Sequence, residues 1–178
     1  KKDYNKAEKY YLIAAEKGND SAMFNLGLFY VDVKKDYDKA EKYYLLAIQK
    51  GNEDANNNLA YLYYSINEIH KKAISLKLTD DFLTHSNPLY LATRTEILLW
   101  NEKIKEAYLV LGELLEKYLE DNEALQAISD ALISFLVFKQ KQFLYKLFTE
   151  KKYDLLKDKF KPIYFALLQE MKNELPDE

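Results

Sequence analysis

Histidine is the residue type most able to act as an acid, a base or a metal ligand near neutral pH. This chain has two, His70 and His85, which lie 15 positions apart. Neither is followed four residues later by a second histidine or a carboxylate, the spacing that puts two metal ligands on one helical turn. We therefore expect both histidines on the surface or in loops, and no metal site.

Carboxylates are the second group that could do chemistry. Glu113, Glu116 and Glu120 share one face of a helix expected in that region. A general acid needs a pocket or partner that shifts its pKa, and the surrounding sequence predicts neither, so a solvated face is the better interpretation. The chain also has no cysteine, no glycine-rich phosphate loop and no serine in a nucleophile elbow. We expect no catalysis and no cofactor.

Lysines and aromatic residues alternate near the C-terminal end, a pattern that offers phosphate contacts and base stacking. The lysines are Lys139, Lys141, Lys146, Lys151, Lys152, Lys157, Lys159 and Lys161, and the aromatic residues are Phe143, Tyr145, Phe148, Tyr153 and Phe160. Against this interpretation, the chain has 25 lysines and one arginine, so bidentate recognition of phosphate is almost absent. Aromatic residues at helical spacing also more often belong to a core. Weak nucleic-acid binding is a disfavoured alternative.

Composition indicates which elements must position these residues. The 178 residues are 48% hydrophobic and 31% charged, with 4 Gly and 3 Pro, which favours a mostly helical protein with few long loops. The longest apolar run, residues 131–138, is far shorter than the roughly 20 residues of a membrane-spanning helix, so we expect no membrane insertion. The chain begins with Lys and shows no signal segment, so we expect part of a longer protein, with a cytoplasmic location favoured.

A repeat dominates the N-terminal part of the chain. Residues 4–30 align without a gap to residues 37–63 with 16 identities in 27 positions. Within each copy, alanines and tyrosines recur at i, i+3, i+4 and i+7, the pattern of a helix buried on one side. The two stripes are Ala7, Tyr10, Tyr11 and Ala14, then Ala40, Tyr43, Tyr44 and Ala47. Each copy therefore predicts one amphipathic helix that packs on its neighbours.

Helix boundaries in the repeat follow from capping chemistry. Asn5 and Asp38 lie three residues before a glutamate, which predicts them as the N-caps of the first helix in each copy. Gly18 and Gly51 are predicted to end those helices, because glycine adopts the left-handed conformation of that position at little cost. Asn19-Asp20 and Asn52-Glu53-Asp54 offer caps for a second helix.

The repeat resembles the Sel1-like repeat family, relatives of the tetratricopeptide repeat. The matching residues are Ala22, Leu26-Gly27, Tyr30, Asp36, Lys39-Ala40, Tyr43-Tyr44, Ala47 and Gly51. The resemblance covers residues 3–65 strongly. It implies antiparallel helix pairs stacked into a right-handed superhelix that holds partner proteins and has no catalytic activity.

We therefore expect an all-α fold, a right-handed α-solenoid of about 9–11 helices. Residues 1–86 are predicted to hold two clear repeats and one degenerate repeat. Residues 87–178 are predicted to be diverged helical hairpins that continue and cap the solenoid, because a terminal repeat would otherwise expose its apolar face. Further helices are expected at about 88–100, 102–120, 122–139, 141–149 and 161–174.

A binding groove follows from this arrangement. The first helix of each stacked pair lines the concave side, and the residues predicted to point into the groove are Phe24, Asn25, Leu28, Asn57, Asn58, Tyr61 and Tyr64. Asn25 and Asn58 share a repeat position, and their amides suit either an extended peptide backbone or support of the neighbouring turn. Arg94, the single arginine, is placed in the same groove, where its guanidinium would bind a partner's carboxylate.

The predicted function is a scaffold that binds a protein or an extended peptide. On this interpretation Asn58→Ala and Tyr61→Ala weaken partner binding and leave the melting temperature nearly unchanged. An architectural segment of a larger multidomain protein, whose surfaces contact only neighbouring domains, is the second interpretation that stays open. The pattern predicts neither the partner's identity nor the oligomeric state.

Overall fold

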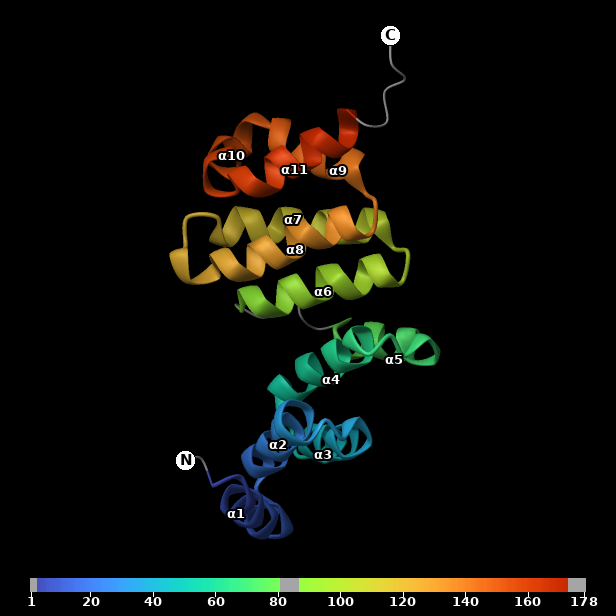
Figure 1. The fold of residues 1–178 in the computed structure, drawn as a ribbon, viewed down its shortest axis with the longest axis vertical. Coiled ribbons are helices and arrows are strands. Elements are labelled where there is room, and N and C mark those ends of the chain that lie inside the picture. The colour runs from blue at the N-terminus through green and yellow to red at the C-terminus, as the bar shows by residue number, and fades with distance from the viewer. Residues whose placement is uncertain (1–2, 81–86, 173–178) are drawn as a thin grey trace. The chain divides into compact units, whose positions relative to one another are not determined.

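The structure is a computed structural model that describes residues 3–80 and 87–172. Within these ranges the chain forms eleven α-helices and no strand, which confirms the all-α prediction. The helices group into two compact units, Lys1–Thr79 and Asp80–Glu178. Figure 1 colours the first unit from blue to green and the second from yellow-green to red. The assignment of the two parts as repeats and as diverged capping hairpins stays a prediction.

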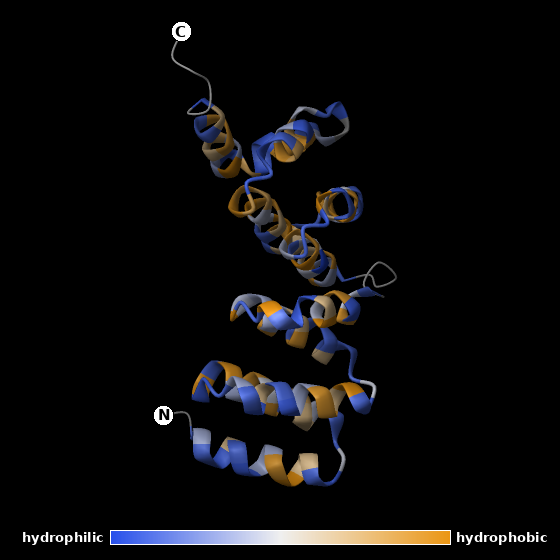
Figure 2. Cartoon of the chain, turned by 90° about the vertical axis from the view of Figure 1, so that its right-hand side faces the viewer, coloured by the Kyte–Doolittle hydropathy of each residue, from blue (hydrophilic) through white to orange (hydrophobic). Residues whose placement is uncertain are grey.

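The first unit is a series of helices in which each packs against the next one along the chain. Its elements are α1 (Tyr4–Glu16), α2 (Asp20–Phe29), α3 (Tyr37–Gln49), α4 (Glu53–Ser65) and α5 (Lys72–Leu78). Figure 2 shows hydrophobic and hydrophilic residues interleaved along these helices, as the periodicity predicts. Packing between consecutive helices keeps most contacts local in sequence, which is characteristic of repeat proteins.

The predicted N-caps of α1 and α3 are wrong by two residues. Asp3 and Asp36 are the caps, and each carboxylate accepts a 3.1 Å hydrogen bond from the backbone amide three residues later. Asn5 and Asp38 lie inside the first helical turn instead. The sequence did carry the signal, because an aspartate stands at the same position in both copies, whereas the next candidate position is Asn in one copy and Asp in the other.

The caps of the second helices are confirmed. Asn19 Oδ1 accepts from the Ala22 amide at 2.7 Å, and Asn52 Oδ1 accepts from the Ala55 amide at 3.1 Å. Each asparagine follows a glycine with a positive φ, 84° at Gly18 and 87° at Gly51, as predicted. Local capping chemistry therefore fixes the turn that joins each pair of helices.

A short connection links α2 to α3. Residues Tyr30–Lys34 form one π-helical turn, and Lys35 adopts a left-handed conformation with φ 55°. The Asp36 amide then donates to the Tyr30 carbonyl at 3.0 Å, which closes the connection just before α3 begins. The turn uses no glycine, and Lys35 adopts the left-handed conformation that glycine often supplies after a helix.

Close helix packing in the first unit depends on one glycine. Gly27 of α2 lies against the ring of Tyr44 of α3, and a Cβ at position 27 would come 2.4 Å from two ring carbons. Tyr44 is almost fully buried there, and its ring also contacts Phe24 with 6.1 Å between centroids. The absence of a side chain at position 27 therefore allows α2 and α3 to approach closely.

The second unit contains α6 (Pro88–Trp100), α7 (Ile104–Tyr118), α8 (Leu125–Val137), α9 (Lys141–Thr149), α10 (Asp154–Lys159) and α11 (Lys161–Lys172). The expected helices agree with five of these within a few residues. The short helix α10 was not predicted. Here α6 packs on both α7 and α8, and α8 also contacts α9 and α11, so the packing is less strictly sequential than in the first unit.

A buried carboxyl lies in the core of the second unit. Glu96 of α6 is 8% exposed, and its Oε1 accepts a 3.2 Å hydrogen bond from the Ser134 hydroxyl of α8. Burial raises the pKa of Glu96 to about 7; the Ser134 hydrogen bond opposes this rise and the nearby Asp130 adds to it. No motif or spacing in the sequence distinguishes Glu96 from the surface glutamates.

Candidate partner-binding surface

Helices α2 and α4, which the comparison below identifies as the first helices of their repeats, each present one side to solvent. In α2 and α4 about half of the positions are buried, and the partly accessible residues of the predicted groove recur at the spacing of a single helical face. We call the first-helix face the set of predicted residues that retain accessible surface. These residues are Phe24, Asn25 and Leu28 on α2, and Asn58, Tyr61 and Tyr64 on α4.

Two members of this face occupy the same repeat position, but one of them has a structural role. Asn25 and Asn58 are both half-buried. The Asn58 side chain hydrogen-bonds the hydroxyl of Tyr44, whose pKa is raised by burial, and it also accepts from the Asn57 amide at 3.4 Å. Removal of the Asn58 amide would therefore leave a buried hydroxyl without this bond, so an unchanged melting temperature is no longer expected for Asn58→Ala.

Asn57 differs from its predicted orientation. Its side chain is 3% exposed, so it lies inside the helix packing and does not point into a groove. Its Nδ2 reaches Asn58, while its buried Oδ1 has no hydrogen-bond partner among the described residues. The repeat explains the difference, because position 57 corresponds to Phe24, which packs on the Tyr44 ring. The same repeat position thus holds an enclosed amide in one copy and a half-buried aromatic ring in the other.

Tyr61 is the most accessible member of the first-helix face. It is 47% exposed and meets the half-buried ring of Tyr64 edge-on, with 5.9 Å between the centroids. A pair of tyrosines at this spacing offers apolar area together with hydroxyl groups, the combination enriched at binding interfaces. Leu28 occupies the position equivalent to Tyr61 one repeat earlier, so both helices place an apolar or aromatic side chain there.

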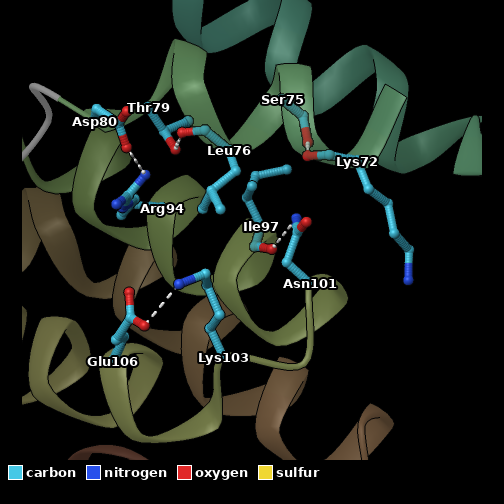
Figure 3. A network of polar contacts seen from close by, with 10 residues as sticks. All are labelled: Lys72, Ser75, Leu76, Thr79, Asp80, Arg94, Ile97, Asn101, Lys103 and Glu106. Atoms are coloured by element: carbon cyan, nitrogen blue, oxygen red, sulfur yellow. Dashed lines mark hydrogen bonds and ion pairs between the residues drawn. The ribbon is translucent and has the colours of Figure 1, made fainter. Parts of the chain in front are cut away.

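Arg94 belongs to the second unit. Its guanidinium Nη1 donates to Asp80 Oδ1 at 3.0 Å, as Figure 3 shows, and its side chain is largely buried while that of Asp80 is exposed. The guanidinium thus binds a carboxylate of its own chain, the kind of group that the sequence analysis assigned to a partner. Its membership of the predicted groove stays a prediction.

A polar cluster that the sequence analysis missed links successive helices in the first unit. Glu8 of α1 accepts a 2.8 Å hydrogen bond from the Tyr30 hydroxyl and pairs with Lys34 at 3.0 Å. These bonds, Lys34 first and Tyr30 second, hold the pKa of Glu8 below its usual value. One repeat later Glu41 accepts from Tyr63 at 2.8 Å and pairs with Lys71. These are the glutamates of the predicted capping spacing, and in the structure their carboxylates bind side chains of neighbouring helices.

The C-terminal aromatic residues are mostly part of the packing. Tyr153, Phe148 and Phe160 are buried and Phe143 is half-buried, while Tyr145 is exposed. Phe143 packs against the Tyr108 ring at 5.4 Å. Base stacking needs exposed ring faces, so this arrangement offers little of the surface that the nucleic-acid alternative requires.

Residues 3–80 and 87–172 hold neither a metal-binding cluster nor a membrane-spanning helix. No group of three or more His, Cys, Asp or Glu side chains in these ranges is arranged to hold a metal ion. His70 is exposed in the described chain, whereas His85 lies outside the described residues. Among the described helices, none has the length and apolar character to cross a bilayer.

The repeat geometry agrees with a known sequence family. The family model of the Sel1 repeat matches residues 1–19, 20–52 and 53–65. Residues 1–65 are therefore similar to Sel1 repeats over three successive segments. The full unit at residues 20–52 holds α2 and α3, so α2 and α4 are the first helices of their repeats. The chain as a whole matches no curated protein and no solved structure.

Sel1 repeats are generally protein-interaction modules, and the family is typically a non-catalytic scaffold. The match ends at residue 65, so the degenerate third repeat within residues 66–86 stays a prediction. All members of the first-helix face lie inside the matched Sel1 repeats.

Proposed function

We propose that the Sel1 repeats of this chain bind an extended segment of a partner protein through the first-helix face. The observation that carries this proposal is a row of accessible residues that recurs at equivalent repeat positions on α2 and α4. Positions 25 and 58, and positions 28 and 61, are equivalent in the repeat and remain partly accessible. A ligand that runs along the stack would therefore meet the same pair of contacts once per repeat.

The chemistry of the face suits a peptide with apolar side chains. Leu28, Tyr61 and Tyr64 supply apolar area, and the Asn25 amide can donate to and accept from a peptide backbone. Tyrosine gives large contact area with few rotatable bonds, so ordering it on binding costs little entropy. We assign Asn58 chiefly to support of Tyr44 and Tyr61 to direct contact.

The test starts from a peptide selected from a random library against the full chain. Its dissociation constant is then compared for the natural chain, Tyr61→Ala and Tyr37→Ala by isothermal titration. Tyr37 is a matched control because it is an exposed tyrosine of α3, outside the first-helix face. We expect Tyr61→Ala to weaken binding about 10-fold or more, the effect of removing a well-packed interface tyrosine.

Two further readouts separate contact from folding. The thermal melt of Tyr61→Ala should stay close to that of the natural chain, because the removed ring lies largely outside the core. Unchanged affinity of Tyr61→Ala and of a Leu28→Ala, Tyr64→Ala double variant would exclude the first-helix face as the site.

A further inference from the structure

Helices α1 and α3 have nearly the same sequence but different surroundings. Nine of their thirteen residues are identical. In the described chain α3 packs against both α2 and α4, whereas α1 packs against α2. We define the α1 face as the four residues equivalent to the alanine and tyrosine stripe of α3. These residues are Ala7, Tyr10, Tyr11 and Ala14.

The exposed fractions of the two equivalent stripes show what the additional neighbouring helix of α3 contributes. On α3, Tyr44 is 2% exposed and both stripe alanines, Ala40 and Ala47, have no exposed surface. On α1, Tyr10 is 59% exposed and the other three residues of the face are half-buried. On α3 these side chains are covered by the preceding helix, α2. On α1 none of the described residues covers the equivalent side chains, and they stay accessible.

The covering helix on α3 defines the chemistry that this face accepts. Tyr43 stacks on Tyr30, the residue that directly follows α2, with 5.5 Å between centroids and 7° between the planes. Lys39 lies 5.2 Å from the centre of the same Tyr30 ring, an arrangement typical of a cation–π contact. Tyr44 occupies the space above Gly27, which any larger residue would fill. The equivalent groups on α1 are Lys6, Tyr10 and Tyr11.

We propose that the α1 face is a docking site for one amphipathic helix of the α2 type, with an aromatic residue, a glycine and a tyrosine at positions i, i+3 and i+6. In this chain these are Phe24 and Gly27 of α2 and Tyr30, its C-cap residue. The partner's tyrosine stacks on Tyr10 beneath the Lys6 ammonium, and its glycine admits the Tyr11 ring. The glycine is the selective element, because any side chain there meets Tyr11.

The first test uses a labelled peptide with the sequence of residues 19–36 and measures its binding to the full chain by fluorescence anisotropy. We expect Tyr10→Ala to weaken binding at least 10-fold, and a peptide with leucine in place of Gly27 to lose a similar factor. Tyr10→Ala is a safe variant to fold, since its ring is mostly exposed. Equal binding by Tyr10→Ala, or by the leucine peptide, would overturn the proposal.

A second test links the added helix covalently to the chain, so that the result does not depend on how helical the free peptide is. Lys1-Lys2-Asp3 repeats Lys34-Lys35-Asp36, so a copy of residues 20–33 placed directly before Lys1 keeps the natural register. We expect this extended chain to melt at a higher temperature than an extended chain whose added copy has leucine for glycine. Equal melting temperatures of the two extended chains would contradict the proposal.

This inference is independent of the proposed function, and the variants distinguish them. Tyr61→Ala should leave the binding of the residue 19–36 peptide within about twofold, because α4 does not carry the α1 face. Sedimentation of the chain alone reports the competing outcome. If the natural chain dimerises and Tyr10→Ala does not, the face is occupied by a second copy, and the α2-type helix is rejected as its partner.

Discussion

The Tyr63 hydroxyl donates a 2.8 Å hydrogen bond to Oε1 of Glu41, which joins α4 to α3. Tyr30 and Glu8 repeat this bond at the same length between α2 and α1. Burial, followed by the Glu41 hydrogen bond, raises the pKa of Tyr63. The two repeat copies therefore share the same polar contact between helices in addition to their apolar packing.

We predict that Tyr63→Phe lowers the free energy of unfolding by about 1–2 kcal/mol, because a hydrogen bond to a charged group is lost while the ring stays in place. Urea unfolding followed by far-ultraviolet circular dichroism measures this. Tyr10→Phe is the control, since that tyrosine is largely exposed, and its curve should overlay that of the natural chain. A Tyr63→Phe midpoint equal to that of the control would show that the Glu41 bond contributes nothing.

Substitution by alanine is predicted to change the stability in opposite directions at two glycines that lie inside helices. Gly27→Ala forces a methyl group to within 2.4 Å of the Tyr44 ring and should cost about 1–3 kcal/mol, as overpacking does. At Gly112 the nearest atom to an added Cβ is the Tyr153 hydroxyl at 3.6 Å. There alanine should stabilise by up to about 1 kcal/mol through its higher helix propensity. Thermal melts compare the two, and a stabilised Gly27→Ala would contradict the packing argument.

Glu96 is predicted to make the second unit less stable as pH rises. Its pKa is about 7 when folded and 4.5 ordinarily, so between these values the folded state holds a proton that the unfolded chain has lost. The contribution of protonated Glu96 to the free energy of unfolding is complete below pH 4.5. It falls between pH 4.5 and pH 7 and is gone above pH 7. Asp130 faces Glu96 from α8, whereas the buried residues of α7 are apolar.

Glu96→Gln should therefore be more stable than the natural chain at pH 8, by up to about 3 kcal/mol, and nearly equal to it at pH 4.5. Fluorescence of Trp100, the single tryptophan and a buried residue of α6, reports unfolding of this unit. Glu113→Gln, which alters a surface glutamate paired with Lys117, is the control. A parallel pH profile for Glu96→Gln and the natural chain would rule out this role.

Asn52 caps a helix, as its counterpart Asn19 does, and it also makes a hydrogen bond to the preceding repeat. Both cap a helix, but Asn52 Nδ2 also donates to Asp20 Oδ2 at 3.0 Å, a bond that holds the pKa of Asp20 below its usual value. Asn52→Asp keeps the cap and places two carboxylates together, so we predict a lower melting temperature that recovers with added salt. Asn19→Asp should be nearly neutral, since Asn and Asp cap equally well. Equal melting temperatures of the two variants would argue against the cross-repeat bond.

Features that depend on a few neighbouring residues followed from the sequence alone. The repeat, the glycine turns at Gly18 and Gly51 and the asparagine caps were predicted because capping and turn chemistry acts within one helical turn. The error at Asp3 and Asp36 has the same local origin, since two acceptors near each start competed for the same amides. Most helices of the second unit were likewise predicted from periodicity.

Burial was decided by the tertiary structure. Tyr10 and Tyr43 stand at the same position of nearly identical helices, yet only the second is stacked beneath a neighbouring helix. Asn57 is enclosed and Glu96 is desolvated for the same reason, namely that burial depends on which other helix covers a face. Sequence periodicity tells which residues share a face of a helix, and only the packed fold tells what lies against that face.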